Sequence, residues 1–255
     1  MAFGVSLWPT ACTATKGLIL KINLYKTYES LSKSKSKDAF FSTLQKAAQN
    51  LGFEYCAYGV RSTYPVSSNK THVINNYPDD WNLTYQLNNY FEIDPTVHHG
   101  LRSTQAFLWE ESIHKEAPIF WEEAKAFGIN YGMSQSQKDA FGRIGMLSFA
   151  SANNHMDAKS LLVHAPSLIW LSQIAHARLS DYLMPLENGE TDYQLTKREK
   201  DILRWTAEGK TSNEIAIVMS ISDRTVNFHI NNIIKKLSVP NKTAAAVKAL
   251  VLNLL

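Results

Sequence analysis

Hydrophobic and polar residues recur with two different periods along the first 183 residues. Five short segments combine β-branched or aromatic residues with a strand-like pattern, at 53–61, 71–76, 106–110, 130–137 and 142–151. Segments with a helical pattern lie before, between and after them, at 38–52, 78–89, 118–128 and 157–183. This order predicts an α+β fold, in which an N-terminal α-β-α sandwich carries helices on both faces of one antiparallel sheet.

Capping residues mark several of the predicted helix ends. Asp38 is a suitable N-cap for the first helix, and Gly52 is a suitable stop. A proline stands near the first position of the helices at 78–89 and 118–128. The segment 157–183 is either one long amphipathic helix or two helices that meet at Pro166.

The last quarter of the chain predicts a separate all-α module. Residues 184–193 contain Pro, Gly and three acidic residues without a hydrophobic period, which is typical of a linker. Thr196 and Glu199 then form a capping box, and Gly209 ends that helix. Ser212 can open a short second helix, which a tight turn connects to a third helix capped by Ser222. A short helix, a tight turn and a polar-faced helix predict a helix-turn-helix.

Charge separates this module from the rest of the chain. Residues 194–255 hold 10 Lys and Arg against 5 Asp and Glu, which leaves 16 basic and 18 acidic residues elsewhere. On the third helix, the buried stripe is expected at Val226, Ile230, Ile233 and Leu237. A strip of amide and cationic groups faces away from it, and such groups can read bases and hold phosphates. A generic three-helix bundle with a solvated basic face is the alternative interpretation.

Several functional classes find no support in the sequence. No apolar run is long enough to span a membrane, and the N-terminus lacks the pattern of a secretory signal. The two cysteines, Cys12 and Cys56, suggest a reducing cytoplasm, with Cys56 as a packed thiol. The His98-His99 pair lacks the spacing of a metal site, and no nucleotide-binding or hydrolase motif occurs. We therefore expect no cofactor and no metal.

The segment 75–95, NNYPDDWNLTYQLNNYFEIDP, is unusually aromatic. Tyr77, Trp81 and Tyr85 follow one another at a spacing of four and share one helical face. Such a stripe is often simply part of a core. Asp94 nearby favours a binding site, because a buried carboxylate needs a hydrogen-bond donor that the amide of a ligand could supply.

The C-terminal segment resembles the DNA-binding domain of LuxR-type regulators in the pieces LTKRE, LRWTAEGKTSNEIA, SISDRTVNFHINNI, KKL and NKTAAAVKA. The pieces YPDDWNLTY, IDPT, FLWE, FWEEAKAFGINYG and GMLSFA resemble the autoinducer-binding domain of the same family, which recognises N-acyl homoserine lactones. The resemblance implies an N-terminal extension at 1–24, a sensory domain at 25–183, a linker at 184–193 and a DNA-binding domain at 194–255. The presence of both Trp81 and Tyr85 favours a lactone over a plant signal.

The resemblance also assigns roles to individual residues. Trp81 would donate to the lactone carbonyl, Asp94 would accept from the amide N–H, and Thr96 would orient Asp94 or a bridging water. The other implied ligand-binding residues are Tyr77, Tyr85, Trp109, Ser148, Ala57 and Gly59, and Gly132 stands where the family keeps a small residue. The implied DNA-binding residues are Lys210, Thr211, Ser222, Arg224, Thr225, Asn227, Phe228, Asn231 and Lys235.

These assignments imply a cytoplasmic, ligand-responsive transcription factor and not an enzyme. Its expected partners are an N-acyl homoserine lactone, double-stranded DNA with a palindromic site, a second copy of the chain and, for an activator, RNA polymerase. The helix at 157–183 and a small-residue stripe at Ala245, Ala249 and Leu252 are the expected dimer contacts. An enzyme that cleaves the lactone is the competing class.

Overall fold

A computed structural model describes residues 24–65, 70–152, 158–185 and 193–255 of the chain. The predicted extension at 1–24, apart from Leu24, and most of the predicted linker at 184–193 lie outside these ranges, as does Cys12. No helix within the described ranges is long and apolar enough to cross a membrane.

A five-stranded antiparallel sheet forms the centre of the N-terminal domain. Its spatial order is β2-β1-β5-β4-β3, so that β5, the last strand in sequence, pairs with the first. The strands are β1 (Tyr55–Ser62), β2 (Thr71–Asn75), β3 (Phe107–Leu108), β4 (Tyr131–Lys138) and β5 (Arg143–Ser151). All five predicted strands are confirmed, although β3 is reduced to two residues.

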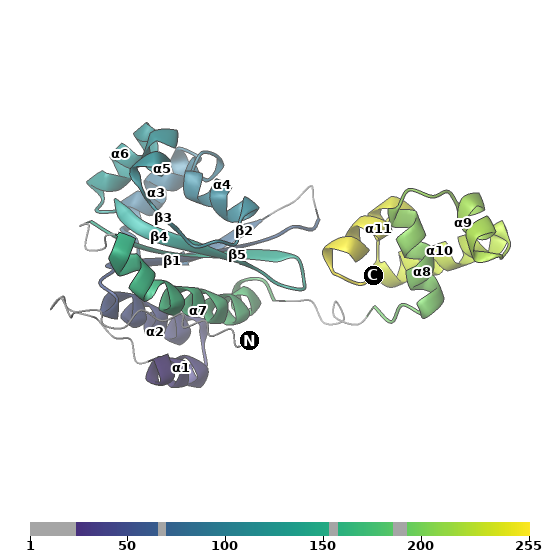
Figure 1. Cartoon of the computed structure of the whole chain (residues 1–255), viewed down its shortest axis with the longest axis horizontal. Helices are drawn as coiled ribbons and strands as arrows, with labels where there is room; N and C mark the ends of the chain where they lie inside the picture. Colours follow the sequence, from purple (N-terminus) through teal and green to yellow (C-terminus); the bar gives the residue numbers. More distant parts are fainter. Residues whose placement is uncertain (1–23, 66–69, 153–157, 186–192) are drawn as a thin grey trace, which may run out of the picture.

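Helices cover both faces of this sheet (Figure 1). On one face lie α1 (Leu24–Lys33), α2 (Lys37–Asn50) and α7 (Ala158–Leu183). Buried side chains of α2 and α7, among them Phe40, Leu44 and Leu171, pack against Tyr58 and Phe149 of the sheet to form the main core. The predicted α-β-α sandwich is therefore confirmed.

The other face carries shorter helices and a second, aromatic core. These helices are α3 (Asp79–Leu87), the 3-10 turn η1 (Tyr90–Glu92), α4 (Pro95–Arg102), α5 (Glu111–Glu116) and α6 (Pro118–Ala126). Trp81, Tyr90, Trp109, Phe120 and Trp121 are the large buried side chains of this layer.

The structure corrects several of the predicted helix ends. Ser36, not Asp38, caps α2, because its side chain accepts the Ala39 N–H and the helix already begins at Lys37. Pro78 is the N-cap of α3 rather than its first residue. Pro166 lies inside a single helix, so that α7 continues through the proline instead of dividing there.

One arginine joins the end of α7 to the sheet. Arg143 begins β5 and is almost completely buried. Its guanidinium lies 2.6 Å from the Asp139 carboxylate and 2.9 Å from that of Asp181 on α7, and it donates to the Met184 carbonyl just after the helix. Two carboxylates and a carbonyl thus surround one buried cation, as its burial requires.

The C-terminal domain contains four helices: α8 (Lys197–Ala207), α9 (Ser212–Met219), α10 (Asp223–Leu237) and α11 (Lys242–Val251). The capping box of Thr196 and Glu199 is present, and Ser222 caps α10 as predicted. A second capping box, which was not predicted, makes Thr211 the N-cap of α9. Between α9 and α10, Ser220 adopts a left-handed conformation with φ 53°.

The small-residue stripe on α11 does not face outward. Ala245 and Ala249 are 1% and 0% exposed and lie in the core of their own domain together with Ile202, Leu203 and Ile233. Their predicted role as dimer contacts is therefore wrong. The small side chains instead allow α11 to pack closely within its domain.

Candidate ligand pocket and nucleic-acid interface

A cavity of about 460 Å³ lies between the sheet and the layer formed by α3, η1, α4 and α6. This volume is in the range of pockets that enclose small organic ligands. The structure brings all nine predicted ligand-binding residues to its wall: Tyr77, Trp81, Tyr85, Asp94, Thr96, Trp109, Ser148, Ala57 and Gly59.

The floor of the cavity consists of three rows of residues that run across paired strands. Side chains two residues apart on one strand point to the same face, and the register aligns them with those of the neighbouring strands. The first row is Asn75, Ala57 and Ser148; the second is Val73, Gly59, Met146 and Ser136; the third is Thr71, Arg61 and Ile144. The floor of the pocket therefore extends along β1 from Ala57 to Arg61.

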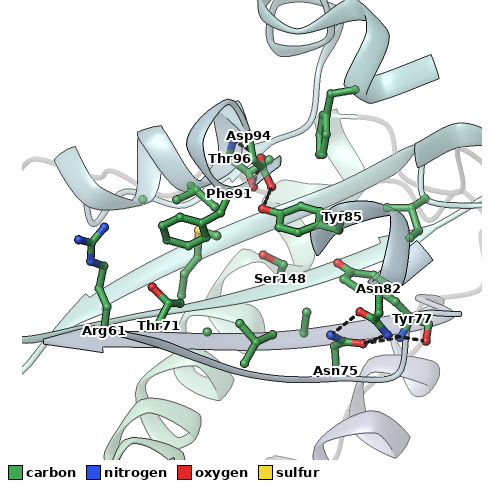
Figure 2. A pocket seen from close by; sticks show the side chains of 18 of the residues that line it. Arg61, Thr71, Asn75, Tyr77, Asn82, Tyr85, Phe91, Asp94, Thr96 and Ser148 are labelled. Carbon is green, nitrogen blue, oxygen red and sulfur yellow. Dashed lines mark hydrogen bonds between the residues drawn. The ribbon is translucent and has the colours of Figure 1, made fainter. Parts of the chain in front are cut away.

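Asp94 is a buried carboxylate in the wall of the cavity (Figure 2). It caps α4, where its Oδ1 accepts the backbone N–H of Thr96 at 2.8 Å and the Thr96 hydroxyl at 2.7 Å. Its Oδ2 accepts the Tyr85 hydroxyl at 2.9 Å. Burial raises the pKa of Asp94 above its usual value, although these hydrogen bonds act in the opposite direction. A further donor from a ligand would stabilise the ionised form.

An aromatic layer lies over the cavity. The Trp81 ring centroid is 5.8 Å from that of Tyr85, 5.9 Å from Tyr90 and 5.7 Å from Phe120. Among the residues that the structure describes, none accepts a hydrogen bond from the Trp81 indole N–H, and Trp81 lines the cavity while only 2% exposed. The indole can therefore supply a donor to a molecule in the pocket.

A chain of hydrogen bonds holds Trp109 over the adjacent strands. The Trp109 indole donates to the Ser134 hydroxyl at 3.0 Å, and this hydroxyl lies 2.7 Å from that of Ser148. Gly132 is required for this packing, because a Cβ there would collide with the Phe149 carbonyl and lie 2.8 Å from the Trp109 ring. This close approach explains why a small residue stands at the position.

Part of the lining of the cavity was not predicted from the sequence. Arg61, Thr71, Met146, Ser136 and Gly100 also contact the cavity. The alternation along β1 that identifies Ala57 and Gly59 could have identified Arg61 two residues further. The remaining residues depend on the pairing of strands far apart in sequence, or on α4, a helix that was not predicted.

The possible metal ligands and Cys56 are the remaining candidate groups of the sequence. No group of three or more His, Cys, Asp or Glu side chains within the described ranges could hold a metal ion. Cys56 is a free, fully buried thiol, and burial raises its pKa, so it is a packed thiol as predicted.

The C-terminal domain presents α10 as a polar outer helix. Val226, Ile230, Ile233 and Leu237 are buried as predicted. The opposite side carries exposed residues that were predicted to contact DNA: Arg224, Asn227, Phe228, Asn231 and Lys235. Phe228 is 62% exposed.

Several predicted DNA-binding residues also make contacts within the domain. The Asn227 amide donates to Asp223 at 3.0 Å and accepts from Ser212 of α9 at 2.9 Å, which joins the two helices of the motif. The hydroxyls of Ser222 and Thr225 lie 2.8 Å apart at the start of α10. Before α9, Thr211 caps the helix, and the Lys210 ammonium lies 5.4 Å from the centroid of the Trp205 ring.

Comparison with known families assigns both halves of the chain. The family "Autoinducer binding domain" matches residues 36–179, and "Bacterial regulatory proteins, luxR family" matches residues 193–249. The chain belongs to the LuxR family of transcription regulators.

Relatives of this LuxR-family regulator match over nearly their whole length. The transcriptional activator protein AnoR of Acinetobacter nosocomialis is 40% identical over 87% of this chain and 94% of its own. The quorum-sensing regulator RhlR of Pseudomonas aeruginosa is 37% identical over 84% and 89%. The crystal structure of Escherichia coli SdiA superimposes with a TM-score of 0.71 at 32% identity, and covers 91% of this chain and 97% of that of SdiA. SdiA has also been solved in complex with octanoyl-rac-glycerol.

Proposed function

We propose that this LuxR-family regulator binds an N-acyl homoserine lactone in the pocket and, as a dimer, binds a palindromic DNA site through α10. The observation that carries the proposal is the pairing of two groups in one apolar cavity: the carboxylate of Asp94 and the indole N–H of Trp81. The ionised Asp94 carboxylate can only accept a hydrogen bond, and the Trp81 indole can only donate one. A homoserine lactone offers an amide N–H to the first and a carbonyl to the second.

The head group would lie between these two residues and Ser148. Thr96 fixes Asp94, so that the carboxylate is oriented before the ligand arrives. Tyr77 or Ser148 would donate to the amide carbonyl or to an oxygen at the 3-position of the chain. Each such hydrogen bond contributes on the order of 1 kcal/mol. This head group therefore supplies orientation and specificity more than affinity.

The acyl chain would lie over Ala57 and Gly59, along β1 and across the rows of the sheet. Burial contributes roughly 0.8 kcal/mol per methylene, so chain length should dominate the selectivity among lactones. An unfilled apolar cavity is costly, so the ligand should stabilise the domain in proportion to its free concentration. The complex of SdiA with octanoyl-rac-glycerol supports an acylated ligand in this fold.

The DNA-binding part of the proposal rests on α10 and the end of the turn before it. Arg224, Asn227 and Asn231 would read base edges in the major groove, with Phe228 between the two amides. Lys210, Thr211, Ser222, Thr225 and Lys235 would contact the backbone. Two copies of α10 in a dimer would lie about one turn of DNA apart, on a palindromic site. Contacts of the α7 region between two copies would form that dimer, and an activator would also contact RNA polymerase in the cytoplasm.

We also propose the domain limits that this function requires: an extension at 1–24, a sensory domain at 25–183, a linker at 184–193 and a DNA-binding domain at 194–255. The regular elements on either side of residue 185 support a boundary there.

A thermal-shift panel over lactones of different chain lengths tests the proposal. We expect the unfolding temperature of the full chain to rise with ligand concentration, and DNA binding to depend on the same ligands. The panel ends with mass spectrometry of the recovered lactone. Intact lactone supports a receptor, whereas a ring-opened product formed at a rate proportional to protein would support the competing lactone-cleaving enzyme. Absence of any shift across the panel would refute the ligand assignment.

A further inference from the structure

The third row of the pocket floor differs in chemistry from the other two. The first two rows are uncharged, but the third contains a cation, Arg61, beside the hydroxyl of Thr71. Figure 2 shows Arg61, Thr71 and Phe91 together at the end of the pocket opposite to Asn75 and Tyr77. The pocket is therefore asymmetric, with a guanidinium at the end opposite to Asn75 and Tyr77.

Arg61 closes this end by contact with an aromatic ring. Its guanidinium carbon lies 5.8 Å from the centroid of the Phe91 ring, within the range of a cation–π interaction. Both side chains are half-buried and both line the cavity. The methylene groups of an arginine in such a position can lie along the apolar wall.

We propose that Arg61, held over Phe91, sets the upper limit of the acyl chain length. This inference rests on the proposed function, since it concerns the other end of the same ligand. Arg61 lies four residues along β1 from Ala57, a distance of about 13 Å at ~3.4 Å per residue. An extended alkyl chain advances about 1.25 Å per carbon, because its bonds are about as long as the Cα–C bond. A chain of roughly ten or eleven carbons that starts at the first row therefore reaches Arg61.

Longer chains meet a barrier of desolvation. To extend further, the alkyl end has to displace the guanidinium from Phe91 or cover it, and covering a charged group without a new partner is unfavourable. A methionine at position 61 removes the charge and keeps an unbranched side chain that packs against alkyl groups. The third row of the pocket floor would then accept the further methylene groups of a longer acyl chain.

The test uses Arg61→Met in the full-length chain and a series of lactones with acyl chains of roughly four to fourteen carbons. For the unchanged protein, affinity should rise with chain length and then fall beyond about ten carbons. In Arg61→Met the maximum should move to chains at least two carbons longer. The affinity for a 12-carbon chain relative to an 8-carbon chain should increase by roughly tenfold or more.

Two further variants separate this effect from general changes of stability. Arg102→Met removes an exposed cation of α4 that does not line the cavity, and it should leave the length profile unchanged. Phe91→Ala removes the ring beneath the guanidinium and should also extend the accepted length; it serves as the test if Arg61→Met does not fold. Arg61→Lys keeps the charge and should retain the limit.

The outcomes distinguish this inference from the function on which it rests. If the unchanged protein binds lactones but neither Arg61→Met nor Phe91→Ala alters the length profile, Arg61 does not set the limit and only the inference fails. If Arg102→Met shifts the length profile as much as Arg61→Met does, the effect is not specific to Arg61 and again only the inference fails. If no lactone of any length binds the unchanged protein, the proposed function fails and the inference fails with it.

Discussion

Replacing Asp94 by asparagine should separate ligand binding from folding. Asparagine has nearly the same shape and is an equally good N-cap, so its side-chain oxygen can still accept the two hydrogen bonds from Thr96. Its amide nitrogen would take the place of Oδ2, where it can donate to the Tyr85 oxygen. The unliganded fold should therefore keep its stability to within about 1 kcal/mol.

The same substitution should strongly weaken the ligand complex. The ligand amide N–H would meet a second donor instead of a carboxylate, and hydrogen bonds to charged groups contribute about 1.5–3 kcal/mol. The dissociation constant should therefore rise by roughly 10- to 150-fold. Burial raises the pKa of Asp94, so its ionisation opposes folding. The folded state therefore loses stability as the pH rises from the usual pKa of 3.8 through the raised pKa. Asp94→Asn removes this dependence of stability on pH.

Thermal shift with and without lactone measures both effects on one sample. Asp80→Asn removes an exposed carboxylate from the first turn of α3 and is the matched control. Ligand affinity in Asp94→Asn that equals the affinity in Asp80→Asn would remove Asp94 from the binding site. A large loss of unliganded stability would instead show that the carboxylate is mainly structural.

Three other substitutions test the DNA interface, the C-terminal core and the packing beside the pocket. Asn227→Ala should weaken binding to the specific DNA site by about 1–3 kcal/mol and change non-specific binding little. Affinities for a specific and a non-specific DNA sequence at one salt concentration measure this difference. Equal losses of affinity for both sequences would mean that Asn227 contacts only the DNA backbone. Burial alone would raise the pKa of Glu199, but hydrogen bonds from Lys236 and Thr196 outweigh it and lower the pKa, so the domain should lose stability as the pH falls below about 4.5. Glu199→Gln should reduce this pH dependence in chemical denaturation, and an unchanged slope would exclude Glu199 as its source. Gly132→Ala should destabilise the sensory domain by about 1–3 kcal/mol, because its Cβ collides with the Phe149 carbonyl and the Trp109 ring; a wild-type melting temperature would show that the strands can move apart there.

Much of the fold follows from local pattern. The strands were predictable because alternation of side chains is visible along each of them, and the buried stripe of α10 because its spacing is regular. The helices α1, α4 and α5 were not predicted; α4 and α5 are short, and α5 has no buried residue to give it a hydrophobic period. Tertiary packing, and not local sequence, decides such segments.

The candidate site was predictable only in part. Asp94 and Trp81 lie in a conspicuous aromatic segment, and the family resemblance assigned their roles. Ser134 and Met146 could not be found in this way, because their positions depend on how β4 and β5 pair. The stripe of Ala245 and Ala249 was misread, since small residues suit a domain core as well as a contact between two chains.

The burial of Arg143 has a mechanical consequence. Its contacts with Asp139, Asp181 and the Met184 carbonyl tie the end of α7 to the strand that supplies Ser148 and Met146 to the pocket. Ser148 and Met146 line the cavity, and the chain continues from Met184 toward the DNA-binding domain. The contacts of Arg143 therefore connect the cavity wall to the start of the linker. A small displacement of β5 should therefore also move Met184.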